Sequence, residues 1–248
     1  MIKNLPQGIE NDTLVLMAIV SPDSPELISI STEWLVLFKP AGWLTIPPTD
    51  GTRPHLKSQA EIALQKEPKG ILSVWARERY NEAFVTHRID RETSGLVLFA
   101  RTPESHRQAS IWFHNRQIKK NYDVLALGSP SAPMLKLSAI IRGQQAVTGI
   151  EVKERFKRAF LGRAIPITGR RHQIRIHLAG AGFPILGDKL YKAPVQILVG
   201  ERPLSVNRVA LHASQLELPN GEMFRADWPA DFTDWVERLR SESGLAAT

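Results

Sequence analysis

Residues 87–100 read HRIDRETSGLVLFA, a charged turn followed at once by an unbroken apolar run. The run at 94–100 is rich in Leu and Val and has the length of a buried strand. The turn before it places one carboxylate, Asp90, between Arg88 and Arg91. Cations on both sides favour the ionised form of a carboxylate, so Asp90 is a candidate nucleophile or base. An Asp that only pairs with arginine and caps a turn would show the same spacing, which leaves both interpretations open.

Signals on either side of this stretch predict further strands and helices. Thr102-Pro103-Glu104 supplies a helix N-cap, a proline at the first helical position and an acid in the first turn. Asn220-Gly221, between two apolar runs, is a strong hairpin signal. We expect strands at 13–20, 35–38, 94–100, 120–127, 149–156, 211–218 and 222–226, and helices at 56–66, 103–116, 172–181 and from Pro229 onward. These elements do not alternate regularly, which predicts an α+β fold with a mainly antiparallel sheet.

The composition is that of an ordinary globular chain that lacks cysteine. Its 248 residues allow one large domain or two small ones, and 43% hydrophobic with 23% charged residues exclude a disordered chain, a collagen and a coiled coil. The lack of cysteine excludes disulfide scaffolds, thiolate zinc sites and cysteine nucleophiles, and favours a reducing compartment. No signal segment opens the sequence, and no apolar run approaches the roughly 18 residues that span a bilayer. We therefore expect a cytoplasmic protein with no membrane partner.

The chain is basic, and the surplus is concentrated in its middle. Its 32 Lys and Arg residues against 25 Asp and Glu residues give a formal net charge of +7. Such a surplus favours a polyanionic partner, nucleic acid before anionic membrane. Residues 151–175 hold eight basic and two acidic side chains, whereas residues 217–242 hold seven acids and three arginines. The basic middle is either a solvated face or a phosphate-binding surface.

Common nucleotide and metal motifs are missing from the sequence. It contains no G-x-G-x-x-G, no G-x-x-x-x-G-K-[ST] and no G-x-S-x-G elbow. His172 and His177 are five residues apart with no acid between them, unlike the two histidines of the H-E-x-x-H zinc motif. We therefore expect neither a metal site nor one of the common nucleotide cradles.

Two further basic segments carry candidate functional residues. Residues 169–177 read GRRHQIRIH, and on a helix Arg171 and Arg175 would share a face, so that one could bind phosphate while the other orients a carboxylate. The plainer alternative is a basic helix N-terminus without a partner, which the helix dipole disfavours.

Residues 120–122, KNY, open a strand. Tyr122 is either half-buried packing or an aromatic ring that stacks on a nucleobase beside a basic pair.

At these segments the chain resembles the RluA-type RNA pseudouridine synthases. Residues 87–96, HRIDRETSGL, are similar to the H-R-[LI]-D-x-x-T-S-G-L signature of that family. The other matches are KPAG at 39–42, KNY at 120–122, GRRHQIRIHL at 169–178, PILGDKLY at 184–191 and LHA at 211–213. They occur in the family's order and cover roughly residues 34–240. Six matches in order are far more specific than any one of them alone.

The resemblance implies a fold, a reaction and a domain organisation. The family fold is α+β, a bent and mainly antiparallel mixed sheet flanked by helices, with a central catalytic cleft. Its members isomerise uridine to pseudouridine in RNA with no cofactor and no metal, so the expected partner is rRNA or tRNA and a monomer suffices. The catalytic domain would span residues 34–248. It would follow an N-terminal extension, residues 1–33, that is too short for the S4 RNA-binding domain that many members carry.

The resemblance also implies roles for individual residues. Asp90 matches the essential carboxylate, which either attacks the sugar covalently or removes a ribose proton to give a glycal. Arg175 would pair with Asp90, and Tyr122 would stack on the base and help to remove the C5 proton. Arg88 matches the arginine that fills the gap left by the flipped uridine, a flip that access to the sugar requires.

A wider set of residues is expected to support the site. The residues expected to bind substrate or RNA are Arg88, Arg91, Lys120, Arg170, Arg171 and His172. His87, Thr93 and Ser94 are expected to hold the catalytic loop, because local side-chain hydrogen bonds usually serve loops. The chain departs from the family at Arg171, where Thr is more usual, and over residues 132–148, which look short and atypical. Both departures bear on the identity of the substrate more than on catalysis.

Two other functions fit parts of the sequence. The charge distribution would also suit a non-catalytic RNA-binding protein or ribosome assembly factor on the same fold. A hydrolase of N-glycosidic bonds would use a carboxylate like Asp90, but such enzymes usually work with a second one, and none is evident in the sequence.

Overall fold

The computed structural model describes residues 24–47 and 70–243. The expected strand at 13–20 and the expected helix at 56–66 lie outside these residues. The strands are β1 (Glu26–Ile30), β2 (Trp34–Lys39), β3 (Phe84–Val85), β4 (Ser94–Ala100), β5 (Lys119–Leu127), β6 (Met134–Ile141), β7 (Gln144–Arg155), β8 (Ala159–Pro166), β9 (Gln196–Val199), β10 (Arg202–Ser205), β11 (Leu211–Glu217) and β12 (Met223–Arg225). The helices are α2 (Leu72–Tyr80), α3 (Pro103–His114), α4 (Gln173–Gly180), the short 3₁₀ helix η1 (Lys189–Tyr191) and α5 (Ala230–Ser243).

One large mixed sheet runs through the described part of the chain. Its order is β1-β2-β4-β11-β5-β8-β7-β6, with β3 on β4 and β12 on β11, while β9 and β10 form a separate hairpin. Among the described strands of this sheet, each pairing is antiparallel except that of β4 with β11. This confirms the predicted α+β class with a mainly antiparallel sheet. β1 precedes residue 34 and adds an edge strand to β2.

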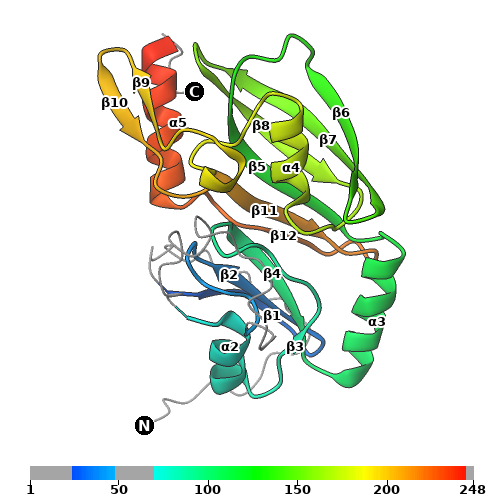
Figure 1. The fold of residues 1–248 in the computed structure, drawn as a ribbon. Helices are drawn as coiled ribbons and strands as arrows, with labels where there is room; N and C mark the ends of the chain where they lie inside the picture. Colours follow the sequence, from blue (N-terminus) through cyan, green and yellow to red (C-terminus); the bar gives the residue numbers. More distant parts are fainter. Residues whose placement is uncertain (1–23, 48–69, 244–248) are drawn as a thin grey trace, which may run out of the picture.

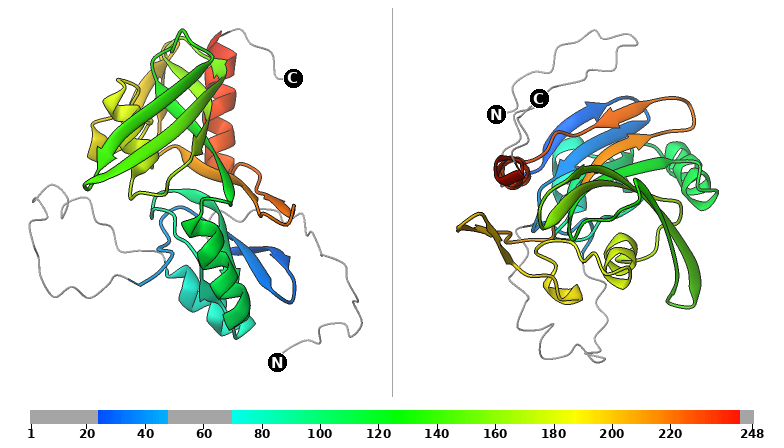
Figure 2. Two further views of the ribbon diagram at one scale, coloured as in Figure 1. Left: turned by 90° about the vertical axis from the view of Figure 1, so that its right-hand side faces the viewer. Right: turned by 90° about the horizontal axis from the view of Figure 1, so that it is seen from above.

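The parallel pair of β4 and β11 joins two halves of the molecule. One half holds β1–β4 with α2 and α3, and the other holds β5–β8 with α4, the β9–β10 hairpin and α5 (Figures 1 and 2). The pairing sets Gly95 opposite Ala213. Gly95 has φ +114°, and a Cβ there would collide with the backbone of Ala213, so glycine is required where the halves meet.

Strands β2 and β4 carry unbroken apolar runs, at 34–38 and 95–100, because both of their faces are buried. Alternate side chains of the two strands belong to two separate hydrophobic clusters, one packed against α3 and the other against α2. A strand that is buried on both sides loses the alternation of polar and apolar residues. This explains the unbroken runs that predicted the two strands.

Local sequence signals predicted the start of α3 correctly but missed the start of β7. At α3, Thr102 accepts a hydrogen bond from the Ser105 backbone and Ser105 reciprocates, so the predicted N-cap is part of a capping box. The strand expected at 149–156 in fact begins at Gln144, because β6 and β7 form a long hairpin that the sequence analysis missed. Its two turn residues, Arg142 and Gly143, both have positive φ, as a tight hairpin turn needs. Arg-Gly is a weaker sequence signal for such a turn than Asn-Gly is.

Candidate active site

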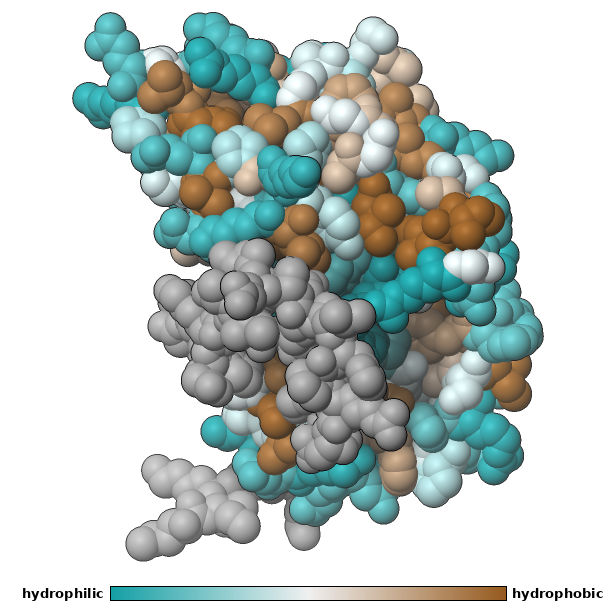
Figure 3. Space-filling view, viewed as in Figure 1, coloured by the Kyte–Doolittle hydropathy of each residue, from teal (hydrophilic) through white to brown (hydrophobic). Residues whose placement is uncertain are grey.

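A pocket of about 160 Å³ lies where the two halves meet. It is lined by Leu44, Thr45, Ile46, Arg88, Ile89, Asp90, Arg91 and Glu92 from the first half, and by Arg171, His172 and Arg175 from the second. In the space-filling view, a hydrophilic area lies at mid-height on the right, below a group of hydrophobic residues (Figure 3). The lining residues come from three separate segments of the chain, 44–46, 88–92 and 171–175.

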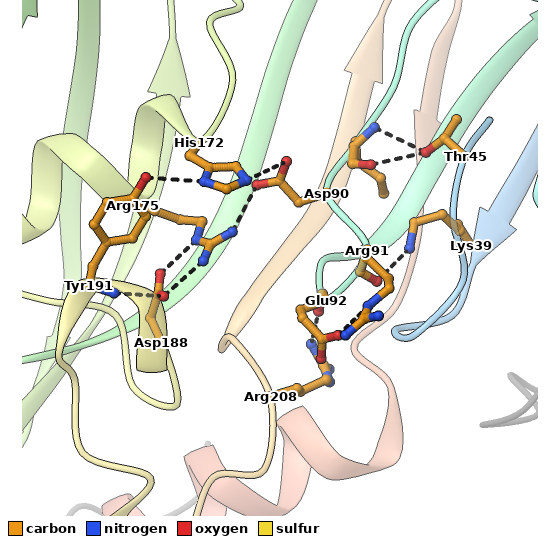
Figure 4. Close-up of polar contacts among 11 residues, drawn as sticks. Lys39, Thr45, Asp90, Arg91, Glu92, His172, Arg175, Asp188, Tyr191 and Arg208 are labelled. Carbon is orange, nitrogen blue, oxygen red and sulfur yellow. Dashed lines mark hydrogen bonds and ion pairs between the residues drawn. The ribbon is translucent and has the colours of Figure 1, made fainter. Parts of the chain in front are cut away.

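Asp90 lies in the loop between β3 and β4 and faces two groups from the other half of the molecule. Its Oδ2 is 3.4 Å from Nη1 of Arg175, and its Oδ1 is 3.7 Å from Nε2 of His172 (Figure 4). The Asp90 side chain is 22% exposed, so it remains accessible from the pocket. The structure thus brings together three of the residues that the sequence singled out.

Arg175 is held by a second carboxylate that the sequence analysis did not assign. Its Nε and Nη2 donate to the two oxygens of Asp188 at 2.6 and 2.8 Å. The ring of Tyr191 lies 5.1 Å from the guanidinium carbon. Burial disfavours the charge on Arg175, but the hydrogen bonds and charge of Asp188 outweigh it and raise the pKa of Arg175. This bidentate contact fixes the plane of the guanidinium and leaves Nη1 for Asp90.

Buried polar contacts hold α4 at the correct place on the sheet. Gln173 Nε2 donates to the Val147 carbonyl and to Thr148 Oγ1, at 3.0 and 2.9 Å. His177 Nδ1 is 2.8 Å from the same Thr148 hydroxyl. These contacts tie the first and second turns of α4 to β7. The position of Arg175 is therefore set by the segment Gln173–His177 rather than by Arg175 alone.

The loop that carries Asp90 is fastened from the other side by Lys39. The Lys39 side chain is fully buried, and its Nζ donates to the carbonyls of Pro40, Trp43 and Arg91 at 3.0, 2.8 and 3.0 Å. Burial lowers the pKa of Lys39 to about 7. KPAG was recognised as a motif without a role, and the structure shows that its lysine cross-links two loops at the pocket.

His87 and His212 make buried hydrogen bonds beside the loop that carries Asp90. His87 Nε2 accepts a hydrogen bond from the Leu98 backbone at 3.0 Å, and Ser94 Oγ lies 3.0 Å from His212 Nδ1. Burial lowers the pKa of His87 to about 3 and that of His212 to about 4. The contacts of His87 and Ser94 agree with the loop-holding role expected for them.

Comparison with known proteins adds to this geometry. A family model described as RNA pseudouridylate synthase matches residues 33–180. The chain belongs to the RNA pseudouridylate synthase family. It is 30% identical over 235 residues to the dual-specificity RNA pseudouridine synthase RluA of Escherichia coli K12, covering 85% of this chain and 96% of that protein. It is 36% identical over 171 residues to an uncharacterized RNA pseudouridine synthase of Zymomonas mobilis, covering 60% of this chain and 75% of the relative.

Solved structures confirm the fold of this RNA pseudouridylate synthase. The human RNA pseudouridylate synthase domain containing 4 superposes with a TM-score of 0.63 at 23% identity, covering 86% of this chain and 92% of that chain. The human domain containing 1 protein gives 0.61 at 22% identity, covering 92% and 90%. The family assignment confirms the resemblance drawn from the motifs. The synthase is accordingly an isomerase that converts uridine to pseudouridine in RNA.

The structure distributes the remaining candidate residues between the pocket and its surroundings. Arg88, Arg91 and Arg171 line the pocket with His172, and Arg91 also pairs with Glu92 at 2.9 Å. Lys120, Tyr122 and Arg170 are not among the residues that line the pocket. Lys120 Nζ lies 5.9 Å from the Phe113 ring centre, and the Arg170 backbone N–H donates to Gln173 at 3.0 Å.

The predicted sharing of a helix face by Arg171 and Arg175 is wrong. α4 begins at Gln173, and His172 before it has φ +56°, so Arg171 lies outside the helix. A left-handed residue turns the chain away from the helical path. Both arginines nevertheless reach the pocket, from the loop and from the helix respectively.

Tyr122 lies on β5 and is partly buried between two hydrophobic clusters. Burial and the nearby negative charge of Asp90 raise the pKa of its phenol. The phenol therefore keeps its proton at neutral pH.

Two further findings concern metals and membranes. Within residues 24–47 and 70–243, no three His, Asp or Glu side chains gather closely enough to hold a metal ion. No helix in this described part of the synthase is long and apolar enough to cross a membrane.

Proposed function

We propose that the synthase modifies uridine in rRNA or tRNA and that Asp90 is the essential carboxylate. The observation that carries this proposal is the pairing of Asp90 with Arg175 inside a pocket of about 160 Å³. Glu92 also lines the pocket, but its carboxylate pairs with the neighbouring Arg91. Asp90 is therefore the carboxylate that is both accessible and aimed by a fixed guanidinium.

The reaction needs no group beyond the chain and its substrate. The bond from N1 to C1′ breaks, the detached base rotates, and C5 bonds to C1′, after which the C5 proton is lost and N1 gains one. Asp90 takes part at the sugar, either by attack on C1′ or by removal of a ribose proton. Arg175 fixes the direction of the carboxylate through the contact of its Nη1 with Oδ2 of Asp90. The protonated phenol of Tyr122 is better suited to stacking on the base than to removing a proton.

Access to the sugar requires that the uridine leaves its stack. A pocket of this size admits one extruded nucleoside at most. Enzymes that act on a single nucleotide extrude it from the stack, and this unstacking costs energy. Arg88 lines the pocket without a described ion-pair partner, and we assign it to the space that the base vacates. Arg91, Arg171 and His172 border the pocket, whereas Lys120 and Arg170 would bind RNA next to it.

The names of relatives and the charge of the chain support the class of RNA. The Escherichia coli relative is named dual-specificity, and a Vibrio parahaemolyticus relative is named ribosomal large subunit pseudouridine synthase C. We further propose that the synthase is a monomer that acts on RNA in the cytoplasm. Residues 34–248 would form the catalytic domain, to which the extension at 1–33 adds β1.

The test uses RNA labelled with tritium at C5 of uridine. Wild-type protein should release tritium to water from total rRNA or tRNA, and Asp90→Asn should abolish the release. Glu92→Gln is the comparison within the same pocket and should retain release within about ten-fold, because the Glu92 carboxylate is turned to Arg91. Undiminished release by Asp90→Asn would refute the assignment. A deletion phenotype fully rescued by Asp90→Asn would favour the non-catalytic alternative.

A further inference from the structure

His172 has a strained backbone that helix capping does not explain. It is the residue before α4, with φ +56° and ψ +20°, and its side chain makes no capping hydrogen bond. A left-handed conformation at a non-glycine residue carries an energetic cost and persists where the surroundings enforce it. The side chain of His172 is instead turned toward the pocket, where it lies between two partners.

These partners are a phenol on one side and a carboxylate on the other. Nδ1 of His172 is 3.1 Å from Oη of Tyr191, and Nε2 is 3.7 Å from Oδ1 of Asp90. The two rings are close to perpendicular, at 88°. Figure 4 shows the imidazole between Tyr191 and Asp90, with one ring nitrogen directed to each.

The chemistry of the partners selects one tautomer of the ring. Burial, as the largest cause, raises the pKa of Tyr191, so its hydroxyl carries a proton that it can donate. If that proton goes to Nδ1, the ring proton sits on Nε2 and faces the Asp90 carboxylate. In the opposite tautomer the lone pair of Nε2 would face the same carboxylate, which is repulsive. The hydroxyl of Tyr191 therefore favours the Nε2–H form.

We infer that Tyr191 holds His172 in the neutral Nε2–H tautomer and that His172 is thereby a positioning residue for Asp90. The inference rests on the proposed role of Asp90. Arg175 fixes one carboxylate oxygen, and the His172 N–H limits where the other can turn. A neutral donor does this without adding a second full charge, so the carboxylate keeps its reactivity as a base or nucleophile.

The groups around the ring determine when this arrangement is lost. The facing groups are Asp90 from the loop before β4, Arg171 from the loop before α4, Arg175 from α4, Asp188 at the N-cap of η1, and Tyr191 in η1. Burial acts most strongly and lowers the pKa of His172, although Asp90 opposes it. The neutral ring therefore predominates at pH 7. Protonation in acid places a cation against Asp90 and makes the carboxylate a weaker base, so the reaction should slow.

Tyr191→Phe is the variant that isolates this contact. It removes only the hydroxyl and keeps the ring, which lies against the Arg175 guanidinium. The backbone N–H of Tyr191, which donates to Asp188 at 3.3 Å, is also unchanged. Tyr80→Phe is the matched control, because Tyr80 packs against Trp75 in α2 and does not line the pocket.

The first measurement is the tautomer itself, read from the ¹⁵N shifts of the histidine rings at pH 7.5. The His172 signals are assigned by their loss in His172→Asn, a replacement that tolerates the left-handed backbone. Wild-type protein and Tyr80→Phe should show the proton on Nε2, and Tyr191→Phe should show a mixture. A proton on Nδ1 in the wild-type protein would overturn the inference. This readout does not depend on activity, so it tests the tautomer even if Asp90 proves not to be the essential carboxylate.

The second measurement is the pH profile of multiple-turnover tritium release, with its KM, from the labelled rRNA or tRNA on which the wild-type protein is active. Tyr191→Phe should be about five-fold slower at pH 7.5, the size expected from losing one neutral hydrogen bond, with KM unchanged. Its acid limb should move to higher pH, because the neutral ring has lost a donor that stabilised it. His172→Asn should lack this limb altogether. A Tyr191→Phe profile that superimposes on those of wild type and Tyr80→Phe would refute the positioning role.

Discussion

Asp188→Asn should destabilise the synthase more than Asp90→Asn, although Asp90 is the residue at the pocket. Asp188 is fully buried and takes two short hydrogen bonds from Arg175, whose side chain is 8% exposed. The asparagine amide would turn an N–H toward the guanidinium and leave a buried charge without its partner. Breaking a buried pair in this way costs about 3–5 kcal/mol. Asp90 is 22% exposed and 3.4 Å from Arg175, so Asp90→Asn should cost less than about 1 kcal/mol.

Urea denaturation at pH 7, followed by circular dichroism, measures both free energies, and tritium release from labelled RNA measures activity. Asp188→Asn should lose stability and part of the activity, because Arg175 is no longer held in plane for Asp90. Asp90→Asn should lose only activity. The double replacement Arg175→Met with Asp188→Leu should cost less stability than Arg175→Met or Asp188→Leu alone, because it leaves no buried charge unpaired. If Asp188→Asn costs under 1 kcal/mol, the reasoning from burial is refuted.

Three further outcomes are expected from other parts of the structure. Lys120→Met should weaken RNA binding and flatten the slope of log affinity against log salt concentration by about 0.7–0.9, the contribution of one phosphate contact. Lys119→Met should leave the slope unchanged, because the exposed Lys119 side chain lies on the other face of β5. Equal slopes for the two variants in a filter-binding series would argue against a phosphate contact at Lys120. Gly95→Ala should destabilise the fold by more than about 2 kcal/mol, because the new Cβ meets the backbone of Ala213. A thermal unfolding midpoint within a few degrees of that of the wild type would contradict the close approach of β4 to β11. Burial lowers the pKa of His212 in the folded protein to about 4 from 6.5, so the unfolded chain takes up a proton first and the free energy of unfolding falls as pH drops from about 6.5 toward 4, by up to about 1.4 kcal/mol per pH unit. His212→Gln should remove this contribution to the dependence of stability on pH between pH 6.5 and 5. An unchanged dependence would show that the buried imidazole is not responsible.

The sequence predicted the main members of the candidate site and, through the family resemblance, the pairing of Asp90 with Arg175, but not the contacts that hold this pair in place. The motif around Asp90 and the basic segment before α4 were recognised because their residues lie close together in the sequence. Asp188 and Tyr191 were quoted within a motif and given no role, although a buried arginine that meets Asp90 needs a further acid to balance it. The need for a second acid becomes evident only when Arg175 is known to be buried. The burial of Arg175 depends on how α4 packs on β7.

The same division holds for the fold. Strands β2 and β4 and the start of α3 were predictable, because the burial of both strand faces and the capping of Thr102 leave their marks within a few residues. The β6–β7 hairpin and the parallel pairing of β4 with β11 were not. The hairpin has a weak turn signal, and the pairing joins segments more than 100 residues apart.

By itself the sequence determined which elements form locally and which residue types are present in the right order for this chemistry. The approach of Arg175 to Asp90 across 85 residues was expected from the family resemblance, but only the tertiary structure decided that Asp188 holds Arg175 and that Lys39 is satisfied by three carbonyls from two loops. The physical reason is the range of the interactions. Propensity, capping and periodicity act between near neighbours, whereas a buried charge finds its partner wherever the folded chain brings one.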